Sequence, residues 1–148
     1  MSVRTLIAVP VYNEAGHVVA VLDQIRQYAD HVIVINDGST DGTKGLLADI
    51  EDVTVLHHPE NRGYGAALKT SFEYAIAGGF DVLVTMDCDG QHQPQLLQKI
   101  ASQVYSGDVP CDMVSGSRYL KPFAENTPAP EERRHINQQI TTCLNEEL

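Results

Sequence analysis

A chain of 148 residues is long enough to form one domain with a buried core, and its ordinary apolar content argues against extensive disorder. Its 20 acidic and 10 basic residues leave a net charge of −10, which is unfavourable for binding nucleic acid. The sequence shows neither a signal peptide nor a run of roughly 20 apolar residues that could cross a membrane, so we expect a cytoplasmic protein.

The cysteines Cys88, Cys111 and Cys143 are odd in number and widely spaced. This pattern argues against a disulfide framework and fits a reducing compartment. Cys88 stands between two aspartates, so a metal-ligand role has to be weighed for it. A small buried side chain at a strand end is the commoner role of such a cysteine, and we favour that interpretation.

Two kinds of segment alternate along the chain. Short β-branched runs predict five strands, at Thr5–Val11, His31–Ile35, Val53–Leu56, Asp81–Thr85 and Met113–Val114. Between them, apolar residues recur at helical spacing over residues 18–28, 46–50, 66–76 and 96–104. This alternation predicts an α/β fold with a mostly parallel, Rossmann-like sheet and helices on both faces.

The boundaries of these segments carry their own signals. Ser39-Thr40-Asp41 offers side-chain oxygens to cap a helix near Gly42, Gly78-Gly79 ends the third helix, and Pro94 suits the first turn of the fourth. After residue 119 the chain changes to a loop and then a polar helix with a narrow stripe of Ile136, Ile140 and Leu144. We therefore expect a domain that is incomplete at its C-terminal end.

Polar residues and glycines follow every predicted strand. They are Pro10–Glu14, Asn36–Ser39, Asn61–Gly65, Asp87–His92 and Gly116–Arg118. Because the carboxyl ends of parallel strands share one edge of the sheet, these segments are expected to converge where open α/β sheets bind ligands.

Asp87 and Asp89 are the sharpest element at this edge. Two aspartates that are two residues apart at a strand exit can hold Mg²⁺ or Mn²⁺, with Gln91 as a third oxygen donor. The alternative is an exposed loop with two solvated acids. His92 either joins this shell, faces solvent or caps the next helix. We interpret His57 and His58 as structural.

Gly63-x-Gly65 opens a predicted helix and brings backbone N–H groups to the same edge. Leu68 replaces the third glycine of a dinucleotide fingerprint, and no Gly-Lys-Ser/Thr follows as a P-loop requires. Arg62 and Arg118 also fall at this edge, where guanidinium groups suit diphosphate oxygens.

These blocks, in this order, resemble the family 2 glycosyltransferases with the GT-A fold, and within them the polyprenyl-phosphate (dolichyl-phosphate) mannosyl- or glucosyltransferases. The resemblance spans residues 5–119. The blocks that carry it are Val9–Glu14, Val34–Thr43, Asn61–Ala67, Met86–Pro94 and Gly116–Tyr119.

The resemblance implies the following roles. Residues 1–119 would form the nucleotide-sugar-binding part, and residues 120–148 would begin the acceptor side. Pro10, Tyr12, Glu14 and Asp37 would line the pocket for base and ribose. Asp87 would contact the ribose or the metal, and Asp89 and Gln91 would hold the metal. Asp89 and Arg118 would act in catalysis, and Arg118 would face the diphosphate or an acceptor phosphate.

The resemblance also implies an inverting transfer from a UDP- or GDP-sugar to a polyprenyl phosphate or a saccharide. A sugar hydroxyl would need a protein base, which the family places beyond the end of this chain. A non-catalytic nucleotide-binding fragment is therefore one alternative. A sugar-phosphate nucleotidyltransferase is another, although Tyr12–Gly16 replaces its usual glycine-rich, arginine-bearing loop. The donor base, the sugar, the acceptor, the oligomeric state and peripheral contact with a membrane stay open.

Overall fold

The computed structural model describes residues 3–90, 92–106, 111–116, 135 and 139. The chain divides into two compact units, Met1–Val114 and Ser115–Leu148, and nearly all described residues belong to the first. Of the helix expected over residues 131–148, only His135 and Gln139 are described, and both have helical backbone. The rest of that expectation lies outside the described residues.

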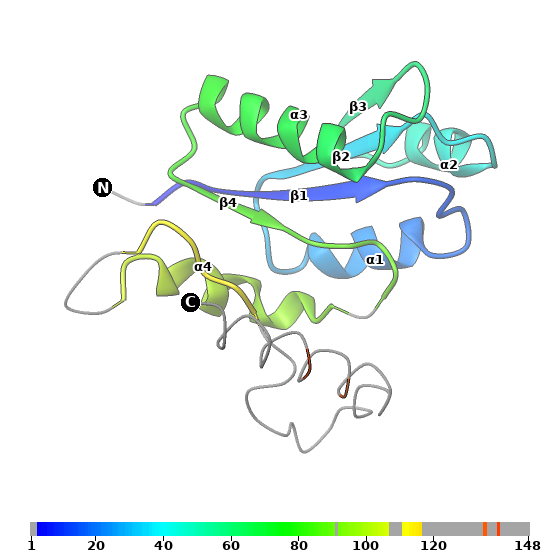
Figure 1. Cartoon of the computed structure of the whole chain (residues 1–148). Coiled ribbons are helices and arrows are strands. Elements are labelled where there is room, and N and C mark those ends of the chain that lie inside the picture. The colour runs from blue at the N-terminus through cyan, green and yellow to red at the C-terminus, as the bar shows by residue number, and fades with distance from the viewer. Residues whose placement is uncertain (1–2, 91, 107–110, 117–134, 136–138, 140–148) are drawn as a thin grey trace. The chain divides into compact units, whose positions relative to one another are not determined.

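Four parallel strands form the sheet in the order β3-β2-β1-β4 (Figure 1). They are β1 (Thr5–Val11), β2 (Val32–Asp37), β3 (Thr54–His58) and β4 (Val82–Thr85). The bounds of β1 match the prediction, whereas β2 and β3 extend two residues further along the chain than predicted. The polar ends of these two strands, Asn36-Asp37 and His57-His58, pair with each other in the ladder.

The fifth strand predicted at Met113–Val114 is wrong. Residues 111–116 contain no strand, and the side chain of Met113 is 84% exposed. The backbone N–H of Cys111 donates to the carbonyl of Val104, which ties this segment to the end of a helix instead of the sheet. Two apolar residues are too short a run to distinguish a strand from an extended loop.

The described helices are α1 (Val18–Ile25), α2 (Thr43–Ala48), α3 (Tyr64–Ala77), the 3₁₀ turn η1 (Pro94–Leu96) and α4 (Leu97–Gln103). Pro94 opens η1 as predicted. The end of α3 also follows the prediction, because Gly79 has φ +62° and Phe80 N–H returns to the carbonyl of Ala75. Within the described part of the chain, no helix is both long and apolar enough to span a bilayer.

Helices cover both faces of the sheet, as the alternation of side chains along β1 requires (Figure 1). Ile7 and Val9 face one side, where α1, α2 and α4 supply the apolar contacts. Leu6 and Ala8 face the other side, where α3 packs through Ala67 and Ala75. The two layers of apolar residues make the sheet a rigid support for the loops at its carboxyl edge.

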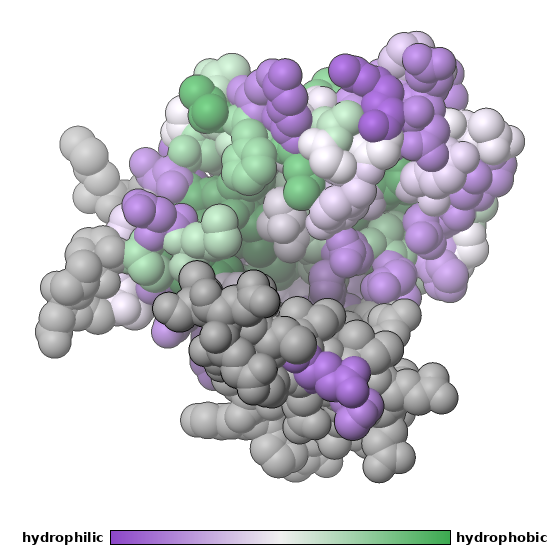
Figure 2. Space-filling view, viewed as in Figure 1, coloured by the Kyte–Doolittle hydropathy of each residue, from purple (hydrophilic) through white to green (hydrophobic). Residues whose placement is uncertain are grey.

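The α3 helix packs on the sheet through small residues. Its buried side chains are Ala67, Ser71 and Ala75, while Phe72 is 53% exposed and Ile76 is 79% exposed. Figure 2 shows hydrophobic residues reaching the surface over this helix. Small side chains allow the helix to approach the strands closely. The larger apolar residues Phe72 and Ile76 lie instead on the outer face of the helix.

Candidate functional site

The strand order reverses at β1, since β2 and β3 lie on one side of it and β4 lies on the other. Pairing between β1 and β4 ends at Ala8 and Thr85, whereas β1 continues to Val11. In open parallel sheets, ligands bind outside the carboxyl ends of the strands at such a reversal. The side of the molecule toward which the strands point is largely hydrophilic (Figure 2).

The loop after β1 is held by side chains from the loop after β2. Asn13, at φ +57°, donates its backbone N–H to the Ser39 hydroxyl and accepts the N–H of Thr40. The next backbone N–H, that of Glu14, donates to the Thr43 hydroxyl at 3.0 Å. The predicted cap residue Asp41 accepts the Thr43 N–H and also the N–H of Ala15. These bonds lock two loops that lie about 26 residues apart in the chain.

Three residues expected to contact the nucleotide lie at this end of β1. Pro10 is half-buried within the strand, and Tyr12 is 44% exposed just beyond it. The Glu14 carboxylate lies 3.0 Å from Nδ1 of His17, and its side chain is 28% exposed. All three therefore border the reversal between β1 and β4.

Asp37, the fourth of these residues, is buried at the end of β2. Its Oδ1 lies 2.6 Å from Nδ1 of His58 and accepts the backbone N–H of Arg62, and its Oδ2 accepts the N–H of Gly63 at 2.8 Å. Burial by itself would raise the pKa of Asp37, but the hydrogen bonds from His58, Arg62 and Gly63 outweigh it and hold the pKa below its ordinary value. Asp37 is therefore ionised at neutral pH.

Gly38 allows the loop between β3 and α3 to pass against the end of β2. It has φ +66°, and a Cβ at this position would lie 2.2 Å from the carbonyl carbon of Glu60. Both the left-handed backbone and the lack of space require glycine here. Backbone contact at this point brings Asn61–Gly63 beside Asp37 at the carboxyl edge.

Asp87 follows β4 and is flanked by two aromatic side chains. The hydroxyl of Tyr64 lies 3.3 Å from its Oδ1, and Nε2 of His92 lies 4.0 Å from its Oδ2. The Asp87 backbone N–H also donates to Nδ1 of His92 at 2.9 Å. His92 therefore faces Asp87 while remaining partly exposed, and the helix after it begins at Pro94 with no side-chain cap.

Cys88 is only 3% exposed and behaves as the small buried residue that the sequence favoured. Burial, and then the negative charges of Glu14 and Asp89, raise the pKa of its thiol to about 12. Its side chain packs in the apolar cluster formed with α1, α2 and α4. The charges that act on Cys88 come from Glu14, after β1, and from the adjacent Asp89, so the loops after β1 and β4 are close enough to interact electrostatically.

Asp87 and Asp89 are the described residues at which a divalent cation was predicted. Within the described ranges, no group of three or more His, Cys, Asp and Glu side chains lies close enough to hold a metal ion. Asp87 and Asp89 nevertheless offer carboxylates at the reversal, and Mg²⁺ typically binds one or two carboxylates together with substrate phosphates. Gln91 and Arg118, predicted for the metal and the phosphates, lie outside the described residues.

The sequence indicated no separate role for Tyr64, a structural role for His58 and three alternatives for His92. Tyr64 contacts Asp87, His92 orients against the same aspartate, and His58 holds Asp37. For Tyr64 a signal existed, because an aromatic residue between two glycines opens a helix at the ligand edge. For His58 the pairing depends on the register of β2 and β3, which the pattern of apolar residues does not specify.

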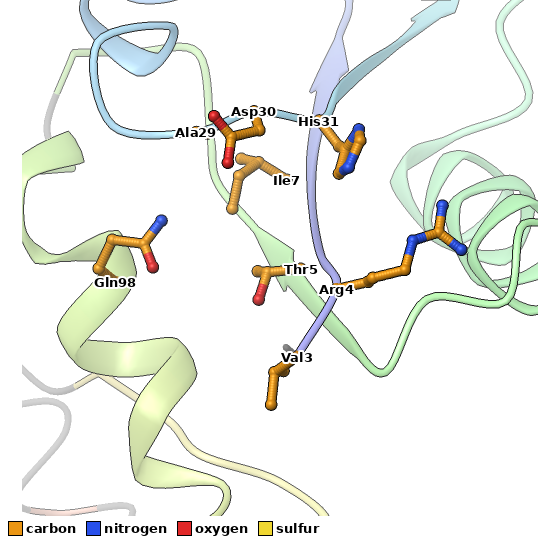
Figure 3. A pocket seen from close by; sticks show the side chains of 8 residues that line it. All are labelled: Val3, Arg4, Thr5, Ile7, Ala29, Asp30, His31 and Gln98. Atoms are coloured by element: carbon orange, nitrogen blue, oxygen red, sulfur yellow. The ribbon is translucent and has the colours of Figure 1, made fainter. Parts of the chain in front are cut away.

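A cavity of about 220 Å³ lies at the opposite, amino end of the strands, and none of the predicted site residues that the structure describes lines it (Figure 3). Arg4, Asp30, His31 and Gln98 are among its lining residues. Arg4 donates to the carbonyls of Gly78 and Gly79, and its guanidinium lies over the ring of Phe80. Its role at this cavity is structural, since it holds the end of α3 to the start of β1.

The described fold defines a class: an α/β protein with a parallel sheet, whose candidate ligand site is an acidic edge where the strand order reverses.

Comparison with known proteins identifies the family. The sequence profile of glycosyl transferase family 2 matches residues 6–146. The chain is 36% identical over 124 residues to polyprenol monophosphomannose synthase of Mycolicibacterium smegmatis, covering 79% of this chain and 46% of that protein. It is also 36% identical over 141 residues to undecaprenyl-phosphate mannosyltransferase of Micrococcus luteus, covering 90% and 56%. A third relative, UDP-N-acetylglucosamine–dolichyl-phosphate N-acetylglucosaminyltransferase of Methanococcus voltae, is 28% identical over 154 residues, covering 92% and 61%.

The chain belongs to glycosyl transferase family 2. This confirms the resemblance found in the sequence, and the parallel α/β sheet is the GT-A-type architecture that the resemblance implied. The chain spans about half the length of the curated relatives it matches.

Proposed function

We propose that this chain binds the donor of a metal-assisted glycosyltransferase that moves a sugar from a nucleoside-diphosphate sugar to a polyprenyl phosphate with inversion. The observation that supports the proposal is that Glu14 follows β1 while Asp87 and Asp89 follow β4, the two neighbouring strands at which the strand order reverses. The names of the relatives, which describe sugar transfer to polyprenyl, undecaprenyl or dolichyl phosphates, support the acceptor class.

The donor is a UDP- or GDP-sugar in this proposal. Pro10, Tyr12 and Glu14 line the nucleoside side of the site, with Asp37 at its base. A carboxylate accepts about four hydrogen bonds, and three donors already engage Asp37, so its Oδ2 retains capacity for a ribose hydroxyl. The exposed Tyr12 ring supplies a flat apolar surface for the base.

The diphosphate lies beside Asp87 and Asp89 in this arrangement. These carboxylates and Gln91 would hold Mg²⁺ or Mn²⁺, which when bound neutralises charge on the departing diphosphate. Arg118 would contact the diphosphate or the acceptor phosphate. Its guanidinium would add fixed positive charge where the leaving group gains an electron pair.

The transfer itself needs little proton chemistry from the protein. An oxygen of the polyprenyl phosphate forms the new bond to the anomeric carbon as the bond to the nucleoside diphosphate breaks, and the electron pair leaves with the diphosphate. Because the acceptor is already an oxyanion, no protein general base is required. Contact with the acceptor takes place at the surface of a membrane, since a polyprenyl chain resides in lipid.

Calorimetric titration of the chain with GDP and UDP, with Mn²⁺ and with EDTA, tests the proposal. We expect binding of one nucleotide that Mn²⁺ strengthens, and loss of that metal dependence in Asp89→Ala. Asp49→Ala, which removes an exposed carboxylate at the end of α2, is the matched control and should behave as wild type. Binding that is indifferent to Mn²⁺ and to Asp89→Ala would refute the assigned site.

A transfer assay separates binding from catalysis. Radiolabelled GDP-mannose and UDP-N-acetylglucosamine are each incubated with undecaprenyl phosphate in detergent, and the lipid product is extracted. Labelled lipid supports the full proposal, whereas metal-dependent binding without any product restricts this chain to a nucleotide-binding module.

A further inference from the structure

Two buried ionisable side chains lie opposite each other at the ends of neighbouring strands. Asp37 and His58 are ladder partners in β2 and β3, and their side chains are 5% and 7% exposed. Removing such groups from water is costly unless each one is hydrogen-bonded. The distance of 2.6 Å between Oδ1 of Asp37 and Nδ1 of His58 meets that requirement.

The ring of His58 has a defined orientation. An ionised carboxylate only accepts hydrogen bonds, so Nδ1 of His58 carries a proton and donates it to Asp37. The other ring nitrogen, Nε2, lies 2.9 Å from the hydroxyl of Thr70 in α3. His58 is thus held from both sides, by β2 and by α3.

Asp37 in turn holds the backbone that opens α3. The N–H groups of Arg62 and Gly63 both donate to its carboxylate. Gly63, at φ +89°, is the residue immediately before α3, and Tyr64 begins the helix and reaches Asp87. A continuous set of contacts therefore joins Thr70 and His58, through Asp37, to the loop beside Asp87.

We infer that His58 is a positioning residue of the donor site, which acts through Asp37 to hold the Arg62–Gly63 backbone and Tyr64 in place at the carboxyl edge. This inference rests on the proposed function, because that function is what makes the carboxyl edge a donor site. The buried pair itself is a property of the free chain. No substrate contact is assigned to His58.

The test uses the full chain and compares His58→Phe with His58→Asn. Phenylalanine fills the space of the ring and removes both hydrogen bonds, whereas the asparagine amide places an N–H donor at the position of Nδ1, which faces Asp37. Thr70→Val removes only the partner of Nε2, and it replaces His58→Phe if that variant does not fold. Val55→Ala, on the same strand but packed in the apolar layer of the other face, is the control for lost stability.

The first measurement is amide hydrogen exchange at Arg62 and Gly63 in the ligand-free chain. We expect exchange to accelerate by at least about tenfold in His58→Phe and to recover in His58→Asn. It should change little in Val55→Ala if that variant has the same thermal midpoint as His58→Phe. Equal acceleration in Val55→Ala, or none in His58→Phe, overturns the inference.

The second measurement is the affinity for GDP and UDP with Mn²⁺. We expect an affinity about tenfold lower in His58→Phe, and close to wild type in His58→Asn and Val55→Ala. Full affinity in a His58→Phe chain whose loop amides exchange faster overturns the positioning role. A wild-type chain that binds neither nucleotide refutes the proposed function instead, and the exchange measurement still reports on the pair.

Discussion

The hydroxyl of Tyr64 lies 3.3 Å from Oδ1 of Asp87, although the two residues are 23 positions apart in the chain. Tyr64 is the first residue of α3, and Asp87 lies in the loop after β4. Burial, and then the charge of Asp87, raise the pKa of Tyr64, so the phenol keeps its proton and donates to the carboxylate. The contact links the start of α3 to the acidic loop after β4, at the place where we propose that the diphosphate binds.

Tyr64→Phe removes this hydrogen bond and leaves the ring in place. We expect Mn²⁺-dependent nucleotide affinity to fall about fivefold, equivalent to about 1 kcal/mol, because the bond is long and partly exposed. Stability should change by less than about 0.5 kcal/mol, since the side chain is 54% exposed. Calorimetry and urea unfolding measure the two effects. Tyr105→Phe, also exposed but on the segment after α4, should alter neither.

Two glycines with opposite surroundings give a matched test of the fold. Gly38→Ala forces a left-handed backbone and a Cβ 2.2 Å from a backbone carbon, so we expect the free energy of unfolding to fall by about 3 kcal/mol. Gly45→Ala meets no atom within 4 Å inside α2 and should raise it by about 0.5–1 kcal/mol. Urea denaturation compares the variants, and equal effects at both sites would contradict the described backbone.

The lowered pKa of Asp37 predicts how stability depends on pH. Between the lowered pKa of the folded state and the ordinary value of 3.8, the unfolded chain binds more protons, so acid favours unfolding. The contribution of Asp37 is therefore complete above about pH 4 and is lost as the pH falls through the folded pKa. Titration of the Asp37 carboxyl carbon by NMR should give a midpoint below 3.8, and a midpoint at or above that value would be inconsistent with the described hydrogen bonds.

Cys88 and Cys111 should differ in reactivity. The Cys88 thiol is buried and its pKa is raised to about 12, whereas Cys111 is exposed. At pH 8 iodoacetamide should therefore modify Cys111 readily and Cys88 only after unfolding, because the thiolate is the reactive form. Peptide mass mapping of native and urea-treated protein gives the comparison. Labelling of both residues at the same rate in the native protein would show that Cys88 is accessible.

The sequence predicted the centre of the sheet because β1 and β2 are largely buried on both faces and consist mostly of apolar residues. Four of the five predicted strands and the order of strands and helices are confirmed. The strand predicted at Met113–Val114 was wrong because a run of two apolar residues does not distinguish a buried strand from an exposed loop. Topology alone predicted that Glu14, Asp87 and Asp89 would follow strands at the same edge, because parallel strands deliver their carboxyl ends to one edge.

By itself, the sequence determined the α/β class, the family and the acidic carboxyl edge, since periodicity, turn residues and ordered motifs are all local properties of the chain. Only the tertiary structure decided that α3 packs through Ala67, Ser71 and Ala75, and that Asp37 meets His58. Tertiary structure also decided that Tyr64 reaches Asp87. These contacts depend on strand register and on the rotation of a helix about its axis, which are set by the packing of the whole domain rather than by neighbouring residues.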